Sequence, residues 1–423
     1  MFKTFQDINN YLNQLGLFKM DLGLEKVQKA LEQLNIPLNF TFIVHIVGTN
    51  GKGSTAHFLE HLARKHGLKT GLFTSPHLVS IKERITVNNC QLSDQLWIQY
   101  ANSTLQHCSN LSLTYFEFLF IISCLAFKEQ KVDIAFFEAG LGGKFDATNV
   151  LKPNLTLFTS IGLDHTDILG NTLIKISIDK AGAIKDAPVI SAFQKKQVLM
   201  VLKKTAGEQS TPFIYSPQAI KIEQNRLILL EKKQTIRLSL YLACFQKYNL
   251  PLIVTCWQEI VKSLNLPFCI KKIETILNST FIPGRLQQVQ TNPDVYLDVG
   301  HNPEGIKLLK QALFQLHIQP QTIVFSCLKD KDLFGIYKEL KEISEDILFC
   351  PLDLSQRGLS LKDLQKLISD LKTLSSFEQV IDLLDKQKSI LFCGSFYLLA
   401  RLFKLYPNWL GKNLLNQNTS LSP

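Results

Sequence analysis

"FIVHIVGTNGKGSTAHFLEHLARK", residues 42–65, places three glycines between an apolar, β-branched run and a helical pattern. A strand, a glycine-rich turn and a helix in this order are typical of a phosphate-binding loop. The common form of that loop, G-x-x-x-x-G-K-[ST], has a glycine where this sequence has Ile46. Here the glycines are Gly48, Gly51 and Gly53. The stretch predicts an α/β domain and leaves open whether its turn binds phosphate.

The turn contains the groups that bind phosphate in such loops. Glycines let the backbone approach an anion and adopt positive φ, while N–H groups at the start of a helix point at it. Lys52 supplies a positive charge for the β and γ phosphates, and Ser54 and Thr55 offer hydroxyls to Mg²⁺. The alternative is a glycine-rich turn capped by Ser54, which leaves Lys52 unexplained. The predicted phosphate-binding residues are Gly48, Thr49, Asn50, Gly51, Lys52, Gly53, Ser54 and Thr55.

Apolar strands and helical patterns alternate along the first two thirds of the chain. This order predicts an α/β domain with a largely parallel sheet. The expected strands are 41–47, 69–74, 132–138, 154–160 and 187–193, and the expected helices are 54–65, 114–129 and 171–184. Residues 219–240 have the pattern of two or three antiparallel strands, which we expect at the edge of that sheet.

A second, smaller α/β domain is expected after Pro283 and Gly284, which interrupt the pattern. Helices are expected at 247–264 and 270–279 before this point, and strands 294–300, 321–328, 346–352 and 389–395 alternate with helices 303–316, 332–341, 360–373, 375–386 and 396–405 after it. Since single cores rarely grow beyond ~250 to 300 residues, a chain of 423 residues is expected to form two domains. We expect them at residues 1–285 and 286–423.

The composition is that of a soluble globular protein, with 46% hydrophobic and 19% charged residues. No apolar run approaches the ~20 residues that span a bilayer, so no membrane partner is expected. The first residues lack the pattern of a secretory signal, and the nine cysteines include no C-x-x-C pair. Because most of the cysteines lie in apolar runs, we expect free thiols in a reducing cytoplasm.

The net charge of +10 is compatible with nucleic acid, a membrane surface or small anionic ligands. Lysine pairs begin at positions 195, 203, 232 and 271, without one dense basic block or interleaved aromatic residues. This distribution favours a solvated surface over a nucleic-acid interface. Small anionic ligands remain compatible with it.

Polar side chains follow four of the expected strands where each strand ends. They are Ser75, Glu138 and the pair Asp164 and His165, together with the phosphate loop after residue 47. In an open α/β sheet the carboxyl ends of parallel strands share one edge, and ligands bind there. Each residue alone could belong to a turn or a cap, but four strands with the same feature predict one site.

Ten motifs in this order carry a resemblance to a known family: VGTNGKGST, TSPHL with ERI, LTYFEF, EAGLGGKFDATN, LDHTDILG, DKAGAI, PGRLQ, LDVGHNP, LKDKD and CGSFYL. Together they resemble the folylpolyglutamate synthase family of the Mur ligase superfamily, especially its bacterial members that also act as dihydrofolate synthase. The resemblance covers the chain from about Asp21 to Tyr397. G-T-N-G-K-G-[ST] is that superfamily's form of the phosphate loop. The resemblance implies a P-loop sheet domain followed by a smaller Rossmann-like α/β domain.

The activity that the resemblance implies is ATP-dependent amide formation. The γ-phosphoryl group of ATP activates a carboxylate as an acyl phosphate, and the amino group of L-glutamate then attacks it. The implied ligands are ATP, Mg²⁺ (two ions), dihydropteroate, folates and L-glutamate, and the implied state is a monomer. A ligase restricted to polyglutamylation and, from another class, a nucleotide-dependent switch or ATPase are the alternatives.

Matching motifs imply three groups of site residues. Ser75, Glu138 and His165 resemble the family's Mg²⁺ ligands, although imidazole is not a ligand that Mg²⁺ ordinarily selects. Lys180 matches the lysine that the family carbamylates on N6; a surface lysine on a helix is the alternative. The implied catalytic residues are Lys52, Lys180 and His165, and further ATP contacts fall on Asn249, Arg285, Asp298 and His301. The implied acceptor-binding residues are Asp21, Leu22 and Gly23 of "KMDLGLEKV", with Thr114, Phe116, Phe145, Asp146 and Ala147.

The sequence departs from the family pattern at a few positions. Lys144 stands where the family usually has arginine, which removes a bidentate fork for a carboxylate. Asp179 replaces the common glutamate before Lys180. For Phe116, stacking on a pterin and packing in the core are equally good interpretations. None of these positions lies in the phosphate loop.

Overall fold

The computed structural model describes residues 1–16, 23–352, 358–359, 364, 366–369, 371–384 and 388–415. The chain forms two compact units, residues 1–221, 229–233 and 248–276 in the first and residues 222–228, 234–247 and 277–423 in the second. Each unit has its own large sheet. Within the described ranges, none of the helices has the length and apolar character that crossing a bilayer requires.

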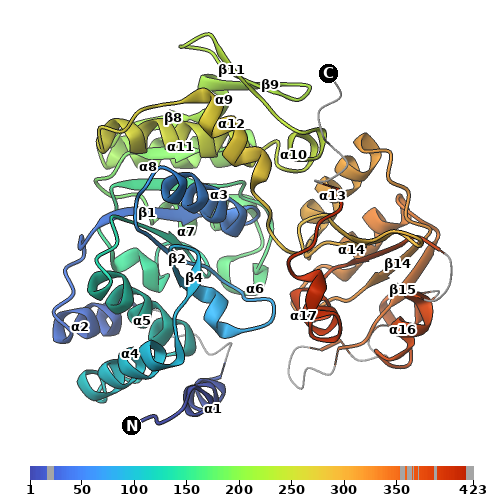
Figure 1. The fold of residues 1–423 in the computed structure, drawn as a ribbon, viewed down its shortest axis with the longest axis horizontal. Helices are drawn as coiled ribbons and strands as arrows, with labels where there is room; N and C mark the ends of the chain where they lie inside the picture. The colour runs from blue at the N-terminus through green and yellow to red at the C-terminus, as the bar shows by residue number, and fades with distance from the viewer. Residues whose placement is uncertain are drawn as a thin grey trace. The chain divides into compact units, whose positions relative to one another are not determined.

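The first unit contains an eight-stranded sheet in the order β4-β3-β2-β5-β1-β6-β7-β8 (Figure 1). Its strands are β1 (Phe42–Val47), β2 (Thr70–Phe73), β3 (Ile85–Val87), β4 (Cys90–Gln91), β5 (Ile134–Glu138), β6 (Leu155–Phe158), β7 (Val189–Ser191) and β8 (Phe213–Tyr215). All neighbouring pairs are parallel except β2 with β3 and β3 with β4. The expected, largely parallel sheet is confirmed, and the antiparallel edge strands add to it.

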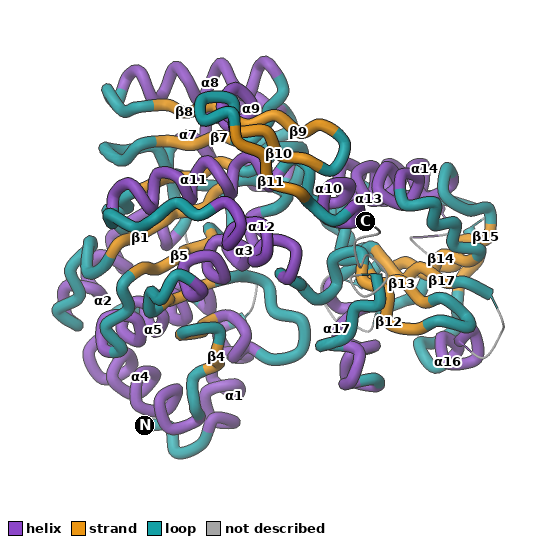
Figure 2. The backbone as a smooth tube through the Cα atoms, turned by 45° about the horizontal axis from the view of Figure 1, so that its top comes forward, coloured by secondary structure: helices purple, strands orange, loops and turns teal. Residues whose placement is uncertain are grey.

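Helices cover both faces of this sheet. They are α1 (Phe5–Leu15), α2 (Glu25–Gln33), α3 (Lys52–Lys65), α4 (Asp94–His107), α5 (Tyr115–Glu129), α6 (Thr166–Leu169), α7 (Leu173–Ala181), α8 (Lys196–Glu208), α9 (Ser216–Ala219), α11 (Asn249–Ser263) and α12 (Ile270–Ser279), with short 3₁₀ turns η1 (Ile81–Arg84) and η2 (Ala147–Val150). α3 packs on β1, β2 and β5 and lies beside α11 (Figures 1 and 2). These contacts place the helix that follows the phosphate loop over the centre of the sheet.

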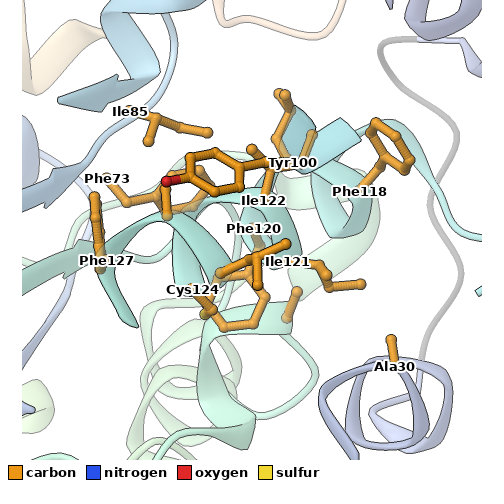
Figure 3. Close-up of a cluster of buried hydrophobic side chains, with 14 of the residues drawn as sticks. Ala30, Phe73, Ile85, Tyr100, Phe118, Phe120, Ile121, Ile122, Cys124 and Phe127 are labelled. Atoms are coloured by element: carbon orange, nitrogen blue, oxygen red, sulfur yellow. The ribbon is translucent and has the colours of Figure 1, made fainter. Parts of the chain in front are cut away.

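The opposite face of β1 is covered by other helices. Ile43 belongs to a core cluster with α1, α2, α4 and α5, whereas Val47 belongs to a cluster with α7 and α8. Because side chains alternate along a strand, Ile43, His45 and Val47 share one face. Figure 3 shows the first cluster, in which Phe73, Phe120 and Phe127 pack together. Burial stabilises this aromatic core by roughly 25 cal/mol per Å² of apolar surface removed from water.

Residues 219–240 form three strands, as expected, but not at the edge of the main sheet. β9 (Ile220–Glu223), β10 (Arg226–Leu229) and β11 (Gln234–Arg237) make a separate three-stranded sheet in the order β11-β10-β9. The expectation of an edge addition was wrong. Leu227, Leu229 and Ile236 are buried, so the small sheet has an apolar face of its own.

The second unit contains a six-stranded sheet in the order β12-β13-β17-β14-β15-β16. Its elements are α10 (Leu240–Phe245), β12 (Gln287–Gln290), β13 (Val295–Leu297), α13 (Pro303–Gln315), β14 (Thr322–Phe325), α14 (Leu333–Lys341), β15 (Asp346–Phe349), β16 (Lys372–Thr373), α16 (Gln379–Leu384), β17 (Ile390–Cys393), α17 (Phe396–Leu405) and η3 (Pro407–Trp409). Apart from β12 with β13, the pairs are parallel, which confirms the second α/β fold.

Two expectations for this unit differ from the structure. Part of the helix expected at 360–373 lies outside the described residues. Residues 364, 366 and 367 are helical, but the last two residues form the edge strand β16. The helix expected at 375–386 is shorter and spans Gln379–Leu384. Leu371, Leu374 and Val380 in this region are buried.

Candidate active site

The carboxyl ends of four neighbouring strands meet at one edge of the first sheet. β2, β5, β1 and β6 are consecutive in the sheet and mutually parallel. They end just before Ser75, at Glu138, before the phosphate loop, and before Asp164 and His165. The sequence prediction that these polar groups share an edge is confirmed.

In the turn after β1, neighbouring groups approach the backbone more closely than a side chain larger than that of glycine would readily allow. Gly51 adopts φ +89°, and a side chain there would strike the carboxamide of Asn249. A side chain at Gly48 would strike Thr159, and one at Gly53 would approach Glu138 Oε2 to 3.3 Å. The three glycines therefore let neighbouring chains come close to the loop.

The first half of the loop is tied to the strand next to β1. The N–H groups of Thr49 and Asn50 both donate to the carbonyl oxygen of Ser160, at 2.9 and 3.2 Å. The Thr49 hydroxyl also exchanges hydrogen bonds with the backbone of Gly162. The helix α3 then begins at Lys52, two residues earlier than expected, so that the N–H groups of its first turn point toward the loop.

Lys52 lies beside Glu138 at the centre of this edge. Its Nζ donates to the carbonyl oxygen of Thr49 and is 4.0 Å from Glu138 Oε1. The other carboxylate oxygen of Glu138 accepts a hydrogen bond from the backbone N–H of Ser75 at 2.9 Å. A cation, a carboxylate and a hydroxyl-bearing residue from three strands are thus brought together.

The same residues fit a hard divalent cation. The Glu138 carboxylate and the Ser75 hydroxyl are oxygen ligands of the kind that Mg²⁺ prefers, and Glu138 is only 4% exposed. Among the described residues, no three His, Cys, Asp or Glu side chains form a ready-made metal cluster. Any ion at this edge must therefore complete its coordination with substrate oxygens or water, as Mg²⁺ commonly does.

His165 lies one strand further along the same edge. It has φ +51° and its backbone N–H donates to Asp164 Oδ1 at 2.9 Å, while its imidazole Nε2 is 4.0 Å from that oxygen. The carboxylate of Asp164 thus fixes the turn that presents the imidazole. The geometry is compatible with His165 as a ligand or as a residue that supports one.

Lys180 is buried, which rules out the alternative of a surface lysine. Lys180 lies on α7 and is only 4% exposed. Its Nζ donates to the carbonyl oxygen of Gly48 at 2.8 Å. Burial, followed by the nearby charge of Lys52, lowers the pKa of the amine to about 7, against the raising effect of Asp179, Asp164 and Asp146. A neutral amine is the form that attacks CO₂ to give a carbamate, so near neutral pH Lys180 is poised for that modification.

Replacing Lys180 by methionine is expected to stabilise the fold, most strongly in acid. In the unfolded chain a lysine keeps its proton up to about pH 10.4, whereas folded Lys180 loses it near pH 7. Between these values unfolding takes up a proton, so the wild-type free energy of unfolding rises with pH, while below pH 7 the full burial cost persists. Urea unfolding at pH 6 and pH 9 in CO₂-free buffer should show a larger gain for Lys180→Met at pH 6. An equal gain at both values would contradict the lowered pKa.

The segment after β5 packs closely on the helix that carries Lys180. A side chain at Gly143 would strike the backbone of Lys180, and the Gly143 N–H donates to Asp179 Oδ1 at 2.9 Å. Burial raises the pKa of Asp179. The shorter carboxylate at this position, a departure from the family pattern, still reaches the glycine-rich segment.

Some of the residues expected to bind the acceptor lie in or against this segment: Phe145, Asp146 and Ala147 belong to it, and Phe116 lies against Gly140. Thr114 caps α5 in a capping box with Glu117, and Phe116 stacks tilted on Phe73 at 5.4 Å. Phe145 is 42% exposed, with the Lys144 ammonium 5.0 Å above its ring. Asp146 and Ala147 are buried. Gly23 lies close to the carboxylate of Glu25. Asp21 and Leu22 lie outside the described residues.

Asn249 joins the site from a distant part of the sequence. It is the first residue of α11, and its carboxamide lies against Gly51. The packing of α11 on α3 brings it there. The structure therefore places this expected nucleotide residue beside the phosphate loop, 198 positions away in the chain, the difference between 249 and 51.

The remaining expected nucleotide residues gather in the second unit. Phe396 lies 5.5 Å from the guanidinium of Arg285 and 5.9 Å from the ring of His301. Asp298 is buried, and its two oxygens accept from the N–H groups of Leu286 and Gly300. Burial raises the pKa of Asp298, opposed by Arg285. The structure brings Arg285 and His301 to one aromatic ring, and the carboxylate of Asp298 interacts electrostatically with both.

One residue at the sheet edge was not predicted from the sequence. Gln194 follows β7, is buried, accepts from the Ile161 N–H at 3.0 Å and donates to the Thr159 carbonyl at 2.8 Å. It thereby braces the turn whose Ser160 carbonyl holds the phosphate loop. The rule that polar residues follow strand ends, applied to the strand at 187–193, would have found it.

Comparison with known proteins agrees with this geometry. The Mur ligase middle domain matches residues 46–181, and the Mur ligase glutamate ligase domain matches residues 284–396. The dihydrofolate synthase/folylpolyglutamate synthase of Bacillus subtilis strain 168 is 33% identical over 429 residues, covering 96% of this chain and 99% of that protein.

Solved structures give the same result. Escherichia coli FolC in complex with DHPP and ADP has a TM-score of 0.85 at 26% identity, covering 96% of this chain and 98% of that one. The bifunctional enzyme of Yersinia pestis complexed with AMPPNP and Mn ion has a TM-score of 0.85 at 28% identity, with the same coverage.

Two α/β units, a phosphate loop and a lysine–carboxylate pair at one sheet edge define an ATP-dependent carbon–nitrogen ligase of the Mur type. Within that class, the chain belongs to the dihydrofolate synthase/folylpolyglutamate synthase family.

Proposed function

We propose that this chain joins L-glutamate to dihydropteroate, forming dihydrofolate, and then to reduced folates, forming folylpolyglutamates. The observation that carries the proposal is the group formed by Lys52, Glu138 and Ser75 around a phosphate loop. Relatives that match nearly the whole chain carry both activities in their names. A related bifunctional enzyme has been solved with Mn, AMPPNP and L-glutamate bound.

The first chemical step brings two anions together. The acceptor carboxylate attacks the γ-phosphorus of ATP, forming an acyl phosphate and releasing ADP, and the glutamate amine then attacks the acyl carbon with loss of phosphate. Catalysis of phosphoryl transfer relies mainly on positioning and positive charge. We assign Lys52 and the N–H groups at the start of α3 to the phosphates, with Asn249 beside Gly51.

Glu138, Ser75 and His165 would hold Mg²⁺, which when bound screens the charges of the phosphates and the acceptor carboxylate. Lys180 lies where a carbamate on its Nζ would face Gly48 of the phosphate loop. In this proposal the carbamate adds a negative charge near the metal ions and requires the lowered pKa of the amine. We assign Arg285, Asp298 and His301 to nucleotide binding and propose the domain boundary at residues 285/286.

The acceptor side is assigned to the segment after β5 and the start of α5. The assigned residues of these two segments are Thr114, Phe116, Phe145, Asp146 and Ala147. Residues 21–23 are assigned to the pterin end of the acceptor. We further propose that the enzyme acts as a monomer in the cytoplasm without a nucleic-acid partner. In support of a reducing compartment, all nine cysteines are free thiols and seven of them are buried.

The test is ADP release by purified protein with ATP, Mg²⁺ and L-glutamate, with and without an acceptor. ADP release that depends on dihydropteroate and, separately, on tetrahydrofolate is the expected result. Release with tetrahydrofolate alone would favour an enzyme restricted to polyglutamylation. If neither pteridine increased ADP release, the proposed function would be wrong.

A further inference from the structure

A buried histidine lies on the central strand, three residues before the phosphate loop. His45 is 1% exposed and occupies the face of β1 between the core residues Ile43 and Val47. Burial, followed by the charge of Lys185, lowers its pKa to about 3. Burying a polar ring costs free energy of folding unless the ring is hydrogen-bonded. A neutral imidazole offers one donor and one acceptor for such bonds.

The imidazole is hydrogen-bonded to a threonine that contacts Asp146. His45 Nε2 is 2.8 Å from Thr148 Oγ1, and the Thr148 hydroxyl also contacts Asp146 Oδ1. An ionised carboxylate only accepts, so the hydroxyl donates to Asp146. The hydroxyl oxygen then accepts from the imidazole, which fixes the tautomer of His45 with its proton on Nε2. Donation runs in one direction, from His45 through Thr148 to Asp146.

Asp146 is the residue that closes the acceptor segment on itself. Besides the Thr148 hydroxyl, its carboxylate accepts from the N–H groups of Thr148 at 3.0 Å and Leu141 at 2.8 Å. These bonds join the two ends of residues 141–148. Burial raises the pKa of Asp146, and the hydrogen bonds from Thr148 and Leu141 oppose this rise. Removing one of these donors therefore loosens the segment and favours the neutral form of the carboxyl group.

We infer that His45 and Thr148 are positioning residues that orient Asp146 for binding of the pteridine acceptor. The acceptor assignment of Asp146 comes from the proposed function, on which this inference rests. Within the part of the chain that the structure describes, the imidazole of His45 bonds to Thr148 and not to the phosphate loop or the metal-binding residues, so its effect falls on the acceptor side. The strand that carries the nucleotide loop thus also fixes the geometry of the acceptor segment.

Thr148→Val tests the relay with little change in shape. Valine replaces the hydroxyl by a methyl group, while Thr148→Ser keeps the hydroxyl. The valine variant is expected to raise KM for dihydropteroate about tenfold and to leave KM for ATP within about twofold, because one hydrogen bond to a charged group is lost. The serine variant is expected to stay within about threefold of the wild type.

His45→Leu and His45→Gln form the second pair. Leucine removes the donor to Thr148, whereas the glutamine amide supplies an N–H at a similar reach. We expect His45→Leu to raise KM for dihydropteroate, His45→Gln to restore part of the affinity, and the double variant His45→Leu, Thr148→Val to equal the more affected single variant rather than the product of both.

Thr104→Val is the matched control. Thr104 is fully buried, and its hydroxyl donates only to the Tyr100 carbonyl within α4. It should lower the melting temperature comparably without changing either KM. Melting temperatures of all variants separate folding from binding. Lower stability with an unchanged KM for dihydropteroate in Thr148→Val and His45→Leu would overturn the inference while leaving the proposed function intact; absence of pteridine-dependent turnover in the wild type would overturn both.

Discussion

Replacing Lys52 by alanine is expected to lower kcat by about 10³-fold, the loss typical of removing a key charge from a transition state in a site shielded from water. The ammonium of Lys52 lies 4.0 Å from Glu138 and next to the loop backbone, where negative charge accumulates during phosphoryl transfer. The fold should persist, since Lys52 starts α3 without capping it by a side-chain bond. ADP release at saturating ATP measures the effect.

Lys65→Ala is the control for this variant. Lys65 is the last residue of the same helix and is exposed. It should retain wild-type turnover and the same thermal unfolding. If Lys52→Ala kept more than about a tenth of the wild-type kcat, the assignment of the loop to the reacting phosphates would be wrong.

Replacing Lys180 by alanine is expected to lower kcat by about 10²-fold or more, because both the amine and any carbamate formed on it are lost. Wild-type activity should also depend on dissolved CO₂, rising when bicarbonate is added at pH 8 to enzyme prepared in CO₂-free buffer. The lowered pKa makes the amine largely neutral at that pH and therefore reactive.

Lys175→Ala, on the exposed side of the same helix, should show full activity. Electron density for a carboxylated Nζ at position 180 in crystals grown with bicarbonate is the direct check. Full activity of Lys180→Ala would remove this lysine from the catalytic group, whereas CO₂-independent activity of the wild type would leave the lysine but remove the carbamate.

The sheet edge could be predicted because strand order and strand ends are local properties of the sequence. Each strand is a short apolar run. Glu138 is the last residue of one run, and Ser75 and His165 lie in the turns after two others. Parallel pairing then places their ends on one side. No long-range contact has to be known for this step, and the family resemblance added the roles of the residues rather than their arrangement.

Other features depend on packing between distant segments. Lys180 is buried, and its Nζ bonds to the carbonyl oxygen of Gly48 in a distant part of the sequence, which no pattern around residue 180 reveals. The separate sheet of residues 220–237 has the same strand pattern that an edge addition would have. In the sequence, His45 resembles an ordinary polar interruption of an apolar strand. Its positioning role is inferred only from its hydrogen bond to Thr148.

The unusual spacing of the phosphate loop has a consequence for the entropy of nucleotide binding. Ile46, where the common pattern has its first glycine, is still paired in β1 with Glu138 and Leu157. The turn therefore begins two residues later, and its next N–H groups are already engaged by Ser160. Few backbone torsions are left to freeze when a phosphate arrives, so the cradle is preorganised and its ordering costs little of the affinity for ATP.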